Sequence, residues 1–196
     1  MQGEQRGNFF TELLKLALLV AVIVIPVRLW VAQPFLVSGA SMEPTFDTGE
    51  YLIIDELSYH LHAPVRFDVV IFRYPKDPSK FYIKRVIGLP GETVHINDSS
   101  VSITKTDGTT EALPEPYLKF PGNGASQTVA LKAGEYFVMG DNRPDSSDSR
   151  YWGALPADNI IGRAFMRLLP VQNFALLPGA YALPAATSAA QAGEQL

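Results

Sequence analysis

The sequence predicts a mainly β domain behind a single N-terminal transmembrane helix. The β domain is predicted because the chain has 15 prolines and 15 glycines among 196 residues, with runs rich in Val, Ile, Tyr and Phe between them. Turn-forming residues that separate short β-branched and aromatic runs are typical of a β protein. One apolar segment near the N-terminus predicts the helix. A chain of this length has room for one domain with its own core and a short appendage.

Composition narrows the possible partners and chemistry. The formal net charge is −4, so the chain offers no basic excess for a phosphate backbone, and we expect no nucleic-acid partner. The chain has no cysteine. This excludes disulfides, a cysteine nucleophile and thiolate metal sites.

The membrane anchor is expected at residues 13–31. The uncharged run 16–27 has twelve residues, whereas a bilayer needs roughly 20. Lys15 and Arg28 flank this run, and their long side chains can reach opposite interfaces, which makes residues 13–31 long enough. A cleaved secretory signal is one alternative, but the cleavage-like Ser38-Gly39-Ala40 lies far beyond the apolar run. A buried core helix is another, but the run lacks the polar face of such a helix.

Basic residues indicate how the anchor is oriented. Arg6 and Lys15 precede the apolar run, whereas no Lys or Arg lies between Arg28 and Arg66. The positive-inside rule then makes residues 1–12 a cytoplasmic tail and places the rest outside. We expect a single-pass protein of the cell membrane, with a thylakoid or other internal membrane as the alternative.

Residues 32–170 are expected to form the β domain. Strands are predicted at six segments between Gly, Pro, Asp or Asn turns: 51–55, 67–72, 81–87, 93–96, 101–103 and 136–139. A small accessory lobe is expected at about residues 97–133. Residues 158–169 fit either a strand or a short helix. Residues 171–196, which end in an Ala, Ser and Gln-rich stretch, are expected to form a flexible tail.

Ser41 is the first candidate for a chemical role. Gly39 and Ala40 leave the backbone before it open on one side, so another chain can approach its hydroxyl closely. Pro44 fixes the turn that follows. A serine in this setting is a candidate nucleophile, although most serines in such turns merely cap or solvate the chain.

A serine nucleophile needs a base, and Lys84 is the main candidate. Strand alternation puts Lys84 on the same face as Tyr82 and Val86. Burial without a countercharge lowers the pKa of a lysine. Lowering it from about 10.4 to ~8 corresponds to roughly 3 kcal/mol, which burial can supply. Neutral Lys84 could then take the proton of Ser41 during attack on a carbonyl. The alternative is a lysine that extends into solvent from an edge strand.

The three histidines are alternative bases or metal ligands. His60 and His62 have a spacing that suits a metal on a strand, but no acidic or histidine partner stands nearby in the sequence. His95 lies in a predicted hairpin and could serve as the base of a triad. We expect His60 and His62 to be solvated, and we expect no metal site and no cofactor.

A polar segment at residues 140–153 is the third element. It follows a predicted strand and reads GDNRPDSSDSRYWG. A calcium loop is an alternative, but the acidic spacing does not follow the EF-hand order. The concentration of Asp, Asn and Arg instead favours a hydrogen-bonded platform beside a site, with an ion pair between Asp148 and Arg150.

In this order behind one N-terminal anchor, the elements resemble the bacterial type I signal peptidase (leader peptidase) family. The resemblance covers about residues 28–170. The matching segments are Gln33-Pro34-Phe35, Ser41-Met42-Glu43-Pro44-Thr45, Arg66-Phe67-Asp68-Val69-Val70, Lys84-Arg85-Val86-Ile87-Gly88-Leu89-Pro90-Gly91-Glu92, Glu115-Pro116-Tyr117 and residues 140–153. The resemblance implies a signal-peptidase-like β-sheet or barrel catalytic domain.

The resemblance also implies roles for individual residues. Ser41 would be the nucleophile, with its backbone N–H as one oxyanion donor, and Lys84 the general base. Ser146 would orient the lysine, supported by the ion pair of Asp148 and Arg150. Gly39 stands where some members carry a serine that completes the oxyanion hole, so another backbone N–H or a water would be the second donor. The residues matching those that line the substrate pockets are Phe35, Val37, Phe46, Tyr82 and Ile83.

The expected function is removal of signal peptides from exported preproteins after Ala-x-Ala sites, through an acyl-enzyme, by a monomer in contact with the lipid bilayer. A self-cleaving Ser/Lys peptidase of the repressor type is one alternative, but such proteins are soluble and carry a DNA-binding N-terminus. A membrane-tethered binding domain without catalysis is another. Ala190-Gln191-Ala192 also resembles a cleavable site, which raises the question of self-trimming.

Overall fold

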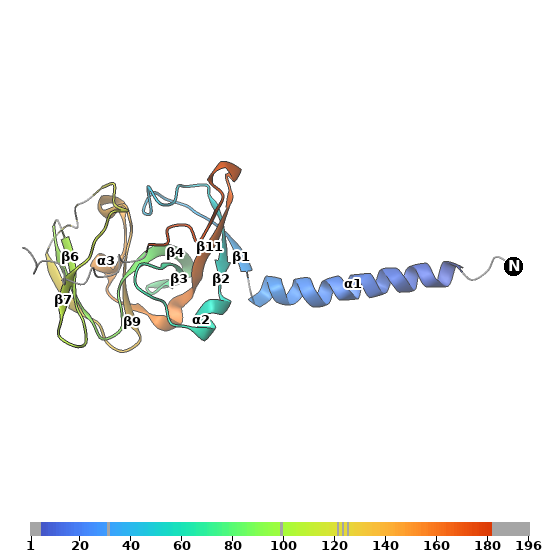
Figure 1. The fold of residues 1–196 in the computed structure, drawn as a ribbon, viewed down its shortest axis with the longest axis horizontal. Coiled ribbons are helices and arrows are strands. Elements are labelled where there is room, and N and C mark those ends of the chain that lie inside the picture. Colours follow the sequence, from blue (N-terminus) through green and yellow to red (C-terminus); the bar gives the residue numbers. More distant parts are fainter. Residues whose placement is uncertain are drawn as a thin grey trace, which may run out of the picture.

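The computed structural model describes residues 5–30, 32–98, 100–120, 122, 124 and 126–181. It is mainly β, as the sequence predicts, with one long helix that extends away from the β body (Figure 1). This helix, α1 (Gln5–Trp30), includes nearly all of the segment expected to form an anchor. Within the described residues, none of the helices combines the length and the apolar character that crossing a bilayer requires. That α1 spans a membrane therefore stays a prediction.

The larger sheet has eight strands in the order β1-β2-β11-β3-β4-β9-β10, and β12 pairs with β11. Its strands are β1 (Ala32–Leu36), β2 (Tyr51–Asp55), β3 (Val69–Tyr74), β4 (Asp77–Gly88), β9 (Glu135–Met139), β10 (Leu155–Pro156), β11 (Ile160–Leu169) and β12 (Ala175–Leu176). Each pairing is antiparallel. Over the described residues this sheet stays open, between β1 at one end and β10 at the other, so the alternative of a closed barrel is not observed.

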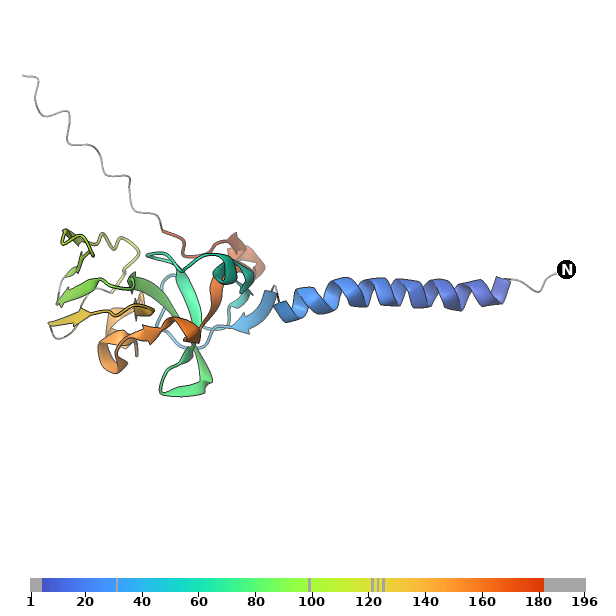
Figure 2. The same ribbon diagram turned by 90° about the horizontal axis from the view of Figure 1, so that it is seen from below.

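The smaller sheet overlaps the segment expected to form an accessory lobe, at about residues 97–133. Its four strands follow the order β7-β6-β5-β8 and comprise β5 (Thr93–Asn97), β6 (Ser100–Thr104), β7 (Thr110–Ala112) and β8 (Gln127–Ala130). This sheet lies at the end of the β body farthest from α1 (Figures 1 and 2). Val94, Ile96, Val101 and Ile103 pack in one core cluster with Phe137 of the large sheet, which joins the two sheets.

A strand is present at each of the six predicted segments, although the one predicted at 67–72 begins only at Val69, since Phe67 has a φ of +71°. Residues 160–169 of the undecided segment also form a strand. Short helices connect the strands: α2 (Leu57–Leu61), η1 (Arg143–Asp145), α3 (Ser149–Trp152), η2 (Ala157–Asn159) and η3 (Val171–Asn173). The strands not predicted as such are short or lie in the loop regions, where few residues carry an alternating pattern.

The flexible tail is predicted to begin at residue 171, but residues 171–181 are folded. Residues 171–181 fold back on the domain through η3 and β12, and β12 pairs with β11 at Met166 and Arg167. Pro178 is buried, and Tyr181 packs on the core cluster that includes Phe67. The rest of the predicted tail, with the Ala-x-Ala-like Ala190-Gln191-Ala192, lies outside the described residues.

Candidate active site

Ser41 lies in the turn that follows β1. Below it, Met42 and Phe46 are both fully buried, and the N–H of Phe46 donates to the carbonyl of Met42 at 2.9 Å. These two apolar anchors hold the turn against the core cluster around Ile54 and Ile71. Ser41 itself is half-buried at the surface of this cluster, where its hydroxyl can meet another chain.

The structure brings Ser41 and Lys84 together across 43 residues of sequence. The Nζ of Lys84, on β4, lies 2.6 Å from the Oγ of Ser41 and donates to it. The same Nζ donates to the carbonyl of Ile83 at 2.8 Å and lies 5.5 Å from the centre of the Tyr82 ring. Lys84 is 4% exposed, so the predicted burial beside Tyr82 is confirmed.

Burial lowers the pKa of Lys84 from 10.5 to about 8. Removal of the ammonium from water is the largest cause; the carboxylates of Asp148 and Asp141 act in the opposite direction, and the guanidinium of Arg150 lowers the pKa further. A useful fraction of Lys84 is then neutral near pH 7, which is the state that can accept a proton from a serine.

Residues 140–142 fix the backbone of the Ser41 turn. The N–H of Asn142 donates to the carbonyl of Ser41, and its side-chain amide donates to the carbonyl of Ala40, both at 3.1 Å. Gly140 packs so closely that an added Cβ would lie 2.4 Å from the Ser41 carbonyl oxygen and 2.2 Å from Ser146 Oγ. Only a glycine permits this approach.

The expected ion pair between Asp148 and Arg150 is present. The Nε of Arg150 donates to Asp148 at 2.8 Å, and both side chains are nearly inaccessible to solvent. The other oxygen of Asp148 accepts from the Gly140 N–H at 3.0 Å and from the Ser146 hydroxyl at 2.7 Å. The carboxylate thus connects the ion pair to the backbone beside Ser41.

Ser146 does not make the contact that the family resemblance implies. Across the described residues, Ser146 and Lys84 share no hydrogen bond; the hydroxyl of Ser146 donates to Asp148 instead. A hydroxyl has one proton to donate, and here the carboxylate of Asp148 accepts it, while the lone pairs of the hydroxyl oxygen stay able to accept from an N–H. In this structure Ser146 contacts Asp148, and its role in orienting Lys84 stays a prediction.

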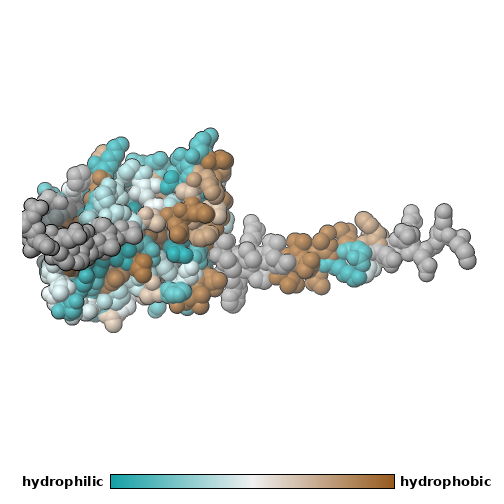
Figure 3. Space-filling view, viewed as in Figure 1, coloured by the Kyte–Doolittle hydropathy of each residue, from teal (hydrophilic) through white to brown (hydrophobic). Residues whose placement is uncertain are grey.

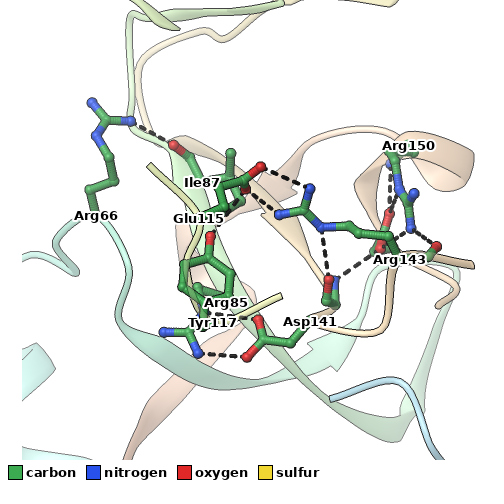
Figure 4. Close-up of polar contacts among 10 residues, drawn as sticks. Arg66, Arg85, Ile87, Glu115, Tyr117, Asp141, Arg143 and Arg150 are labelled. Carbon is green, nitrogen blue, oxygen red and sulfur yellow. Dashed lines mark hydrogen bonds and ion pairs between the residues drawn. The ribbon is translucent and has the colours of Figure 1, made fainter. Parts of the chain in front are cut away.

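A second network of buried charges was missed in the sequence. Arg85, next to Lys84 on β4, donates to both oxygens of Asp141, at 2.9 and 2.6 Å, and both side chains are 1% exposed. Arg143 pairs with Glu115, whose carboxylate also accepts from the hydroxyl of Tyr117 (Figure 4). The signal was an arginine on the buried face of a strand, since such a cation needs a carboxylate partner.

A cavity of about 440 Å³ opens beside Ser41 and Lys84. Of the five predicted pocket residues, Phe35, Val37, Tyr82 and Ile83 line it. Phe46 does not: it is fully buried beneath the Ser41 turn, because its ring is needed in the core. The lining residues missed in the sequence include Leu52, Ile71, Phe81 and Ser147.

Gly39 has no part in a hydroxyl-based oxyanion site. Its φ of +97° is a conformation that other residues rarely adopt, and its N–H donates to the Thr48 hydroxyl at 3.0 Å. The N–H of Ser41 has no hydrogen-bond partner within the described part of the chain. It is thus available to a ligand.

The histidines make no hydrogen bond to Ser41 or Lys84 within the described residues. His60 and His62 are exposed at α2, and no group of three metal-binding side chains occurs among the residues that the structure describes. His95 is in the accessory sheet, where its ring nitrogens contact the hydroxyls of Thr104 and Thr128.

Known proteins that are similar to this chain are signal peptidases. The family model described as signal peptidase, peptidase S26, matches residues 10–169. The probable signal peptidase I-1 of Synechocystis sp. is 37% identical over 92% of this chain and 93% of that protein. Signal peptidase I of Leptolyngbya laminosa is 36% identical over 78% of this chain and 76% of its own length. Signal peptidase I V of Bacillus subtilis is 36% identical over 72% of this chain and 88% of its own length.

Proposed function

We propose that Ser41 and Lys84 are the dyad with which this protein removes signal peptides from exported preproteins. The chain belongs to the signal peptidase family, peptidase S26, and is a type I signal peptidase hydrolase. The contact of 2.6 Å between Lys84 Nζ and Ser41 Oγ is the observation that carries this proposal. A buried lysine with a lowered pKa beside a serine hydroxyl is a general base in position.

The reaction follows from this pair. Neutral Lys84 takes the proton of Ser41 as Oγ attacks the carbonyl of the residue at position −1, and the Ser41 N–H donates to the developing oxyanion. Lys84 then gives its proton to the leaving amine, which departs with the mature protein. Water, activated by Lys84, hydrolyses the acyl-enzyme that remains on Ser41.

The cavity determines which substrates fit. Its walls are mainly large apolar side chains, among them Phe35, Leu52 and Ile83. Phe35 and Phe81 meet edge to face, with ring centres 5.4 Å apart, and so stiffen one wall. A substrate laid extended past β1 and β4 could place small side chains at positions −1 and −3 here, whereas large ones would clash. Ala-x-Ala selectivity is thus steric exclusion.

A cleavage assay with two variants tests the dyad. The detergent-solubilised protein is given a preprotein with an Ala-x-Ala site, in parallel with Ser41→Ala and Lys84→Ala. We expect cleavage after the −1 alanine by the wild type and a loss of at least about 1000-fold in each variant. An active Lys84→Ala variant would refute the dyad, and an inert wild type on several preproteins would favour the binding-domain alternative.

We further propose that α1 anchors the domain in the cell membrane, with the N-terminus cytoplasmic and the catalytic domain outside. Large apolar side chains between Phe9 and Val22 are exposed along the described part of α1 (Figure 3), and a bilayer would cover them. Carbonate extraction and vesicle flotation test this with wild type and a Leu18→Glu, Val22→Glu double variant. Wild type in the soluble fraction would contradict anchoring; membrane retention lost in the variant supports it.

A further inference from the structure

Residues 177–181, the last described part of the chain, pack against the Ser41 turn. We call residues 177–181 the C-terminal strap. It leaves the β11–β12 pair with the N–H of Leu177 donating to the carbonyl of Phe165 at 2.7 Å. A turn follows, closed by the N–H of Ala180 on the carbonyl of Leu177 at 3.0 Å. Both ends of this turn are therefore held, and Gly179 lies between them.

Gly179 hydrogen-bonds to the residue next to Lys84. Its carbonyl accepts from the Nη1 of Arg85 at 2.6 Å, and the same Nη1 donates to the carbonyl of Phe67 at 3.0 Å. The remaining bonds of this guanidinium go to Asp141. Because Arg85 is 1% exposed, loss of the Gly179 carbonyl would leave a buried N–H without an acceptor.

Gly179 also packs directly against the Ser41 turn. A Cβ at this position would lie 2.8 Å from Thr45 Cγ2, and 3.1 Å from atoms of Phe46 and Val69. The φ of Gly179 is +76°, so a side chain would be strained as well as crowded. The hydroxyl of Thr45 donates to Asp141 at 2.5 Å. Thr45, in the Ser41 turn, thus contacts both the strap and Asp141.

Tyr181, at the end of the strap, adds contacts with two aromatic rings. Its ring centre lies 5.1 Å from that of Phe67 and 5.8 Å from that of Tyr117, both edge to face. Tyr117 in turn lies beneath the guanidinium of Arg85 at 4.1 Å, and Figure 4 shows Tyr117, Arg85 and Asp141 gathered at one place. Arg85 is therefore enclosed between Tyr117 and the strap.

We propose that the C-terminal strap positions the dyad, and that Gly179 is a positioning residue for Ser41 and Lys84. It acts on Ser41 through Thr45 and on Lys84 through Arg85, its neighbour on β4. A shift of the strap would displace the turn relative to the strand and so lengthen the Lys84–Ser41 contact. This proposal rests on the proposed function, since it assumes that the dyad performs the reaction.

Gly179→Ala tests the strap, and Gly134→Ala is its matched control. Gly134 has a φ of +75° against +76° for Gly179, but a Cβ there would meet nothing within 4 Å. Both variants therefore carry the same backbone strain, and only Gly179→Ala carries the collision. In the full-length protein with an Ala-x-Ala preprotein, we expect kcat of Gly179→Ala to fall about tenfold or more below that of Gly134→Ala, with KM within about twofold.

Thr45→Ser provides a rescue. It removes Cγ2, the atom nearest to the new Cβ, and keeps the hydroxyl that bonds to Asp141. The double variant Gly179→Ala, Thr45→Ser should recover at least about threefold in kcat over Gly179→Ala, beyond the product of the two single effects. Purely multiplicative effects, or equal kcat for Gly179→Ala and Gly134→Ala, would overturn the proposal.

Amide hydrogen exchange tests the effect of the strap on the Ser41 turn without relying on catalysis. The N–H of Asn142 donates to Ser41 and that of Phe46 to Met42, so peptides with these amides report on the turn. We expect faster exchange at both in Gly179→Ala and wild-type rates in Gly134→Ala. If the wild type fails to cleave preproteins, the proposed function fails while this measurement still decides the strap. Unchanged exchange at both amides in Gly179→Ala would overturn the strap alone.

Discussion

Replacement of Lys84 by methionine should inactivate the protein and make its fold more stable near neutral pH. Burial holds the pKa of Lys84 at about 8 in the folded chain, against 10.5 for a lysine in water. The folded state therefore binds fewer protons at this site than the unfolded state does between these values. The resulting destabilisation is complete below pH 8 and disappears as the pH rises toward 10.5. Methionine has a similar length and carries no charge, so it removes this destabilisation at every pH.

The size of the effect follows from the pKa difference. A shift from 10.5 to about 8 corresponds to about 3 kcal/mol of destabilisation at pH 7. Methionine also loses the hydrogen bonds that Nζ donates to Ser41 and Ile83, which offsets about 1–2 kcal/mol. The net gain at pH 7 is then about 1–2 kcal/mol. The part that depends on pH is independent of this offset, and it should decrease by roughly 2 kcal/mol between pH 7 and pH 10.

Denaturant unfolding of both proteins in the same detergent, at pH values from 7 to 10, measures this difference. Taking the difference between variant and wild type at each pH removes the titration of all other groups. Lys76→Met, a change at an exposed lysine, controls for the substitution itself. A stability difference between Lys84→Met and wild type that stays constant from pH 7 to pH 10 would refute a lowered lysine pKa and, with it, the role of Lys84 as a neutral base.

Four further predictions concern the surroundings of the dyad. The rate of preprotein cleavage by the wild type should rise about tenfold per pH unit up to about pH 8 and then level off. Asp148→Asn should move this rise to lower pH, because the carboxylate raises the pKa of Lys84. Arg150→Gln should move it to higher pH, because the guanidinium lowers that pKa. Gly140→Ala should reduce kcat at least about 100-fold, since its Cβ would overlap the Ser41 carbonyl, whereas Gly108→Ala, with open space around it, should leave kcat unchanged. Ile83→Ala should widen the cavity and allow cleavage after valine or leucine at −1, which mass spectrometry of the products would show. Asp141→Ala should cost about 3–5 kcal/mol in urea unfolding, because it leaves the buried Arg85 unpaired.

The sequence was most informative where one strand carries its own pattern. Alternation from Phe81 to Ile87 identified the strand, and the neighbours of Lys84 predicted its burial. The proximity of Ser41 to Lys84 could not be predicted from the residue pattern. A contact between residues 43 positions apart depends on where the fold places β4 relative to the turn after β1. It followed from the resemblance of several separated motifs to one family.

The sequence was least informative about pairs of polar residues. Asp141 could have paired with any of several arginines, and only the fold determines that it meets Arg85. Ser146 has one proton to donate, and no pattern tells that Asp148 accepts it. The sequence does not predict the strap for a related reason. Pro178 and Gly179 are typical of irregular loops, yet here a glycine is required because the backbone of residue 179 lies close to Thr45.

The pairing of the buried charges near Ser41 and Lys84 bears on the proposed mechanism. Asp141 and Asp148 hold Thr45, Gly140 and Ser146 with charge-assisted bonds, which are stronger and more directional than neutral ones. An unpaired carboxylate in this position would also stabilise the ammonium of Lys84 and raise its pKa, which would leave no base near neutral pH. Arg150 opposes part of this effect, because its guanidinium lowers the pKa of Lys84, while burial remains the largest cause of the shift. The ion pairs thus allow a rigid polar support beside a lysine whose pKa is determined mainly by burial.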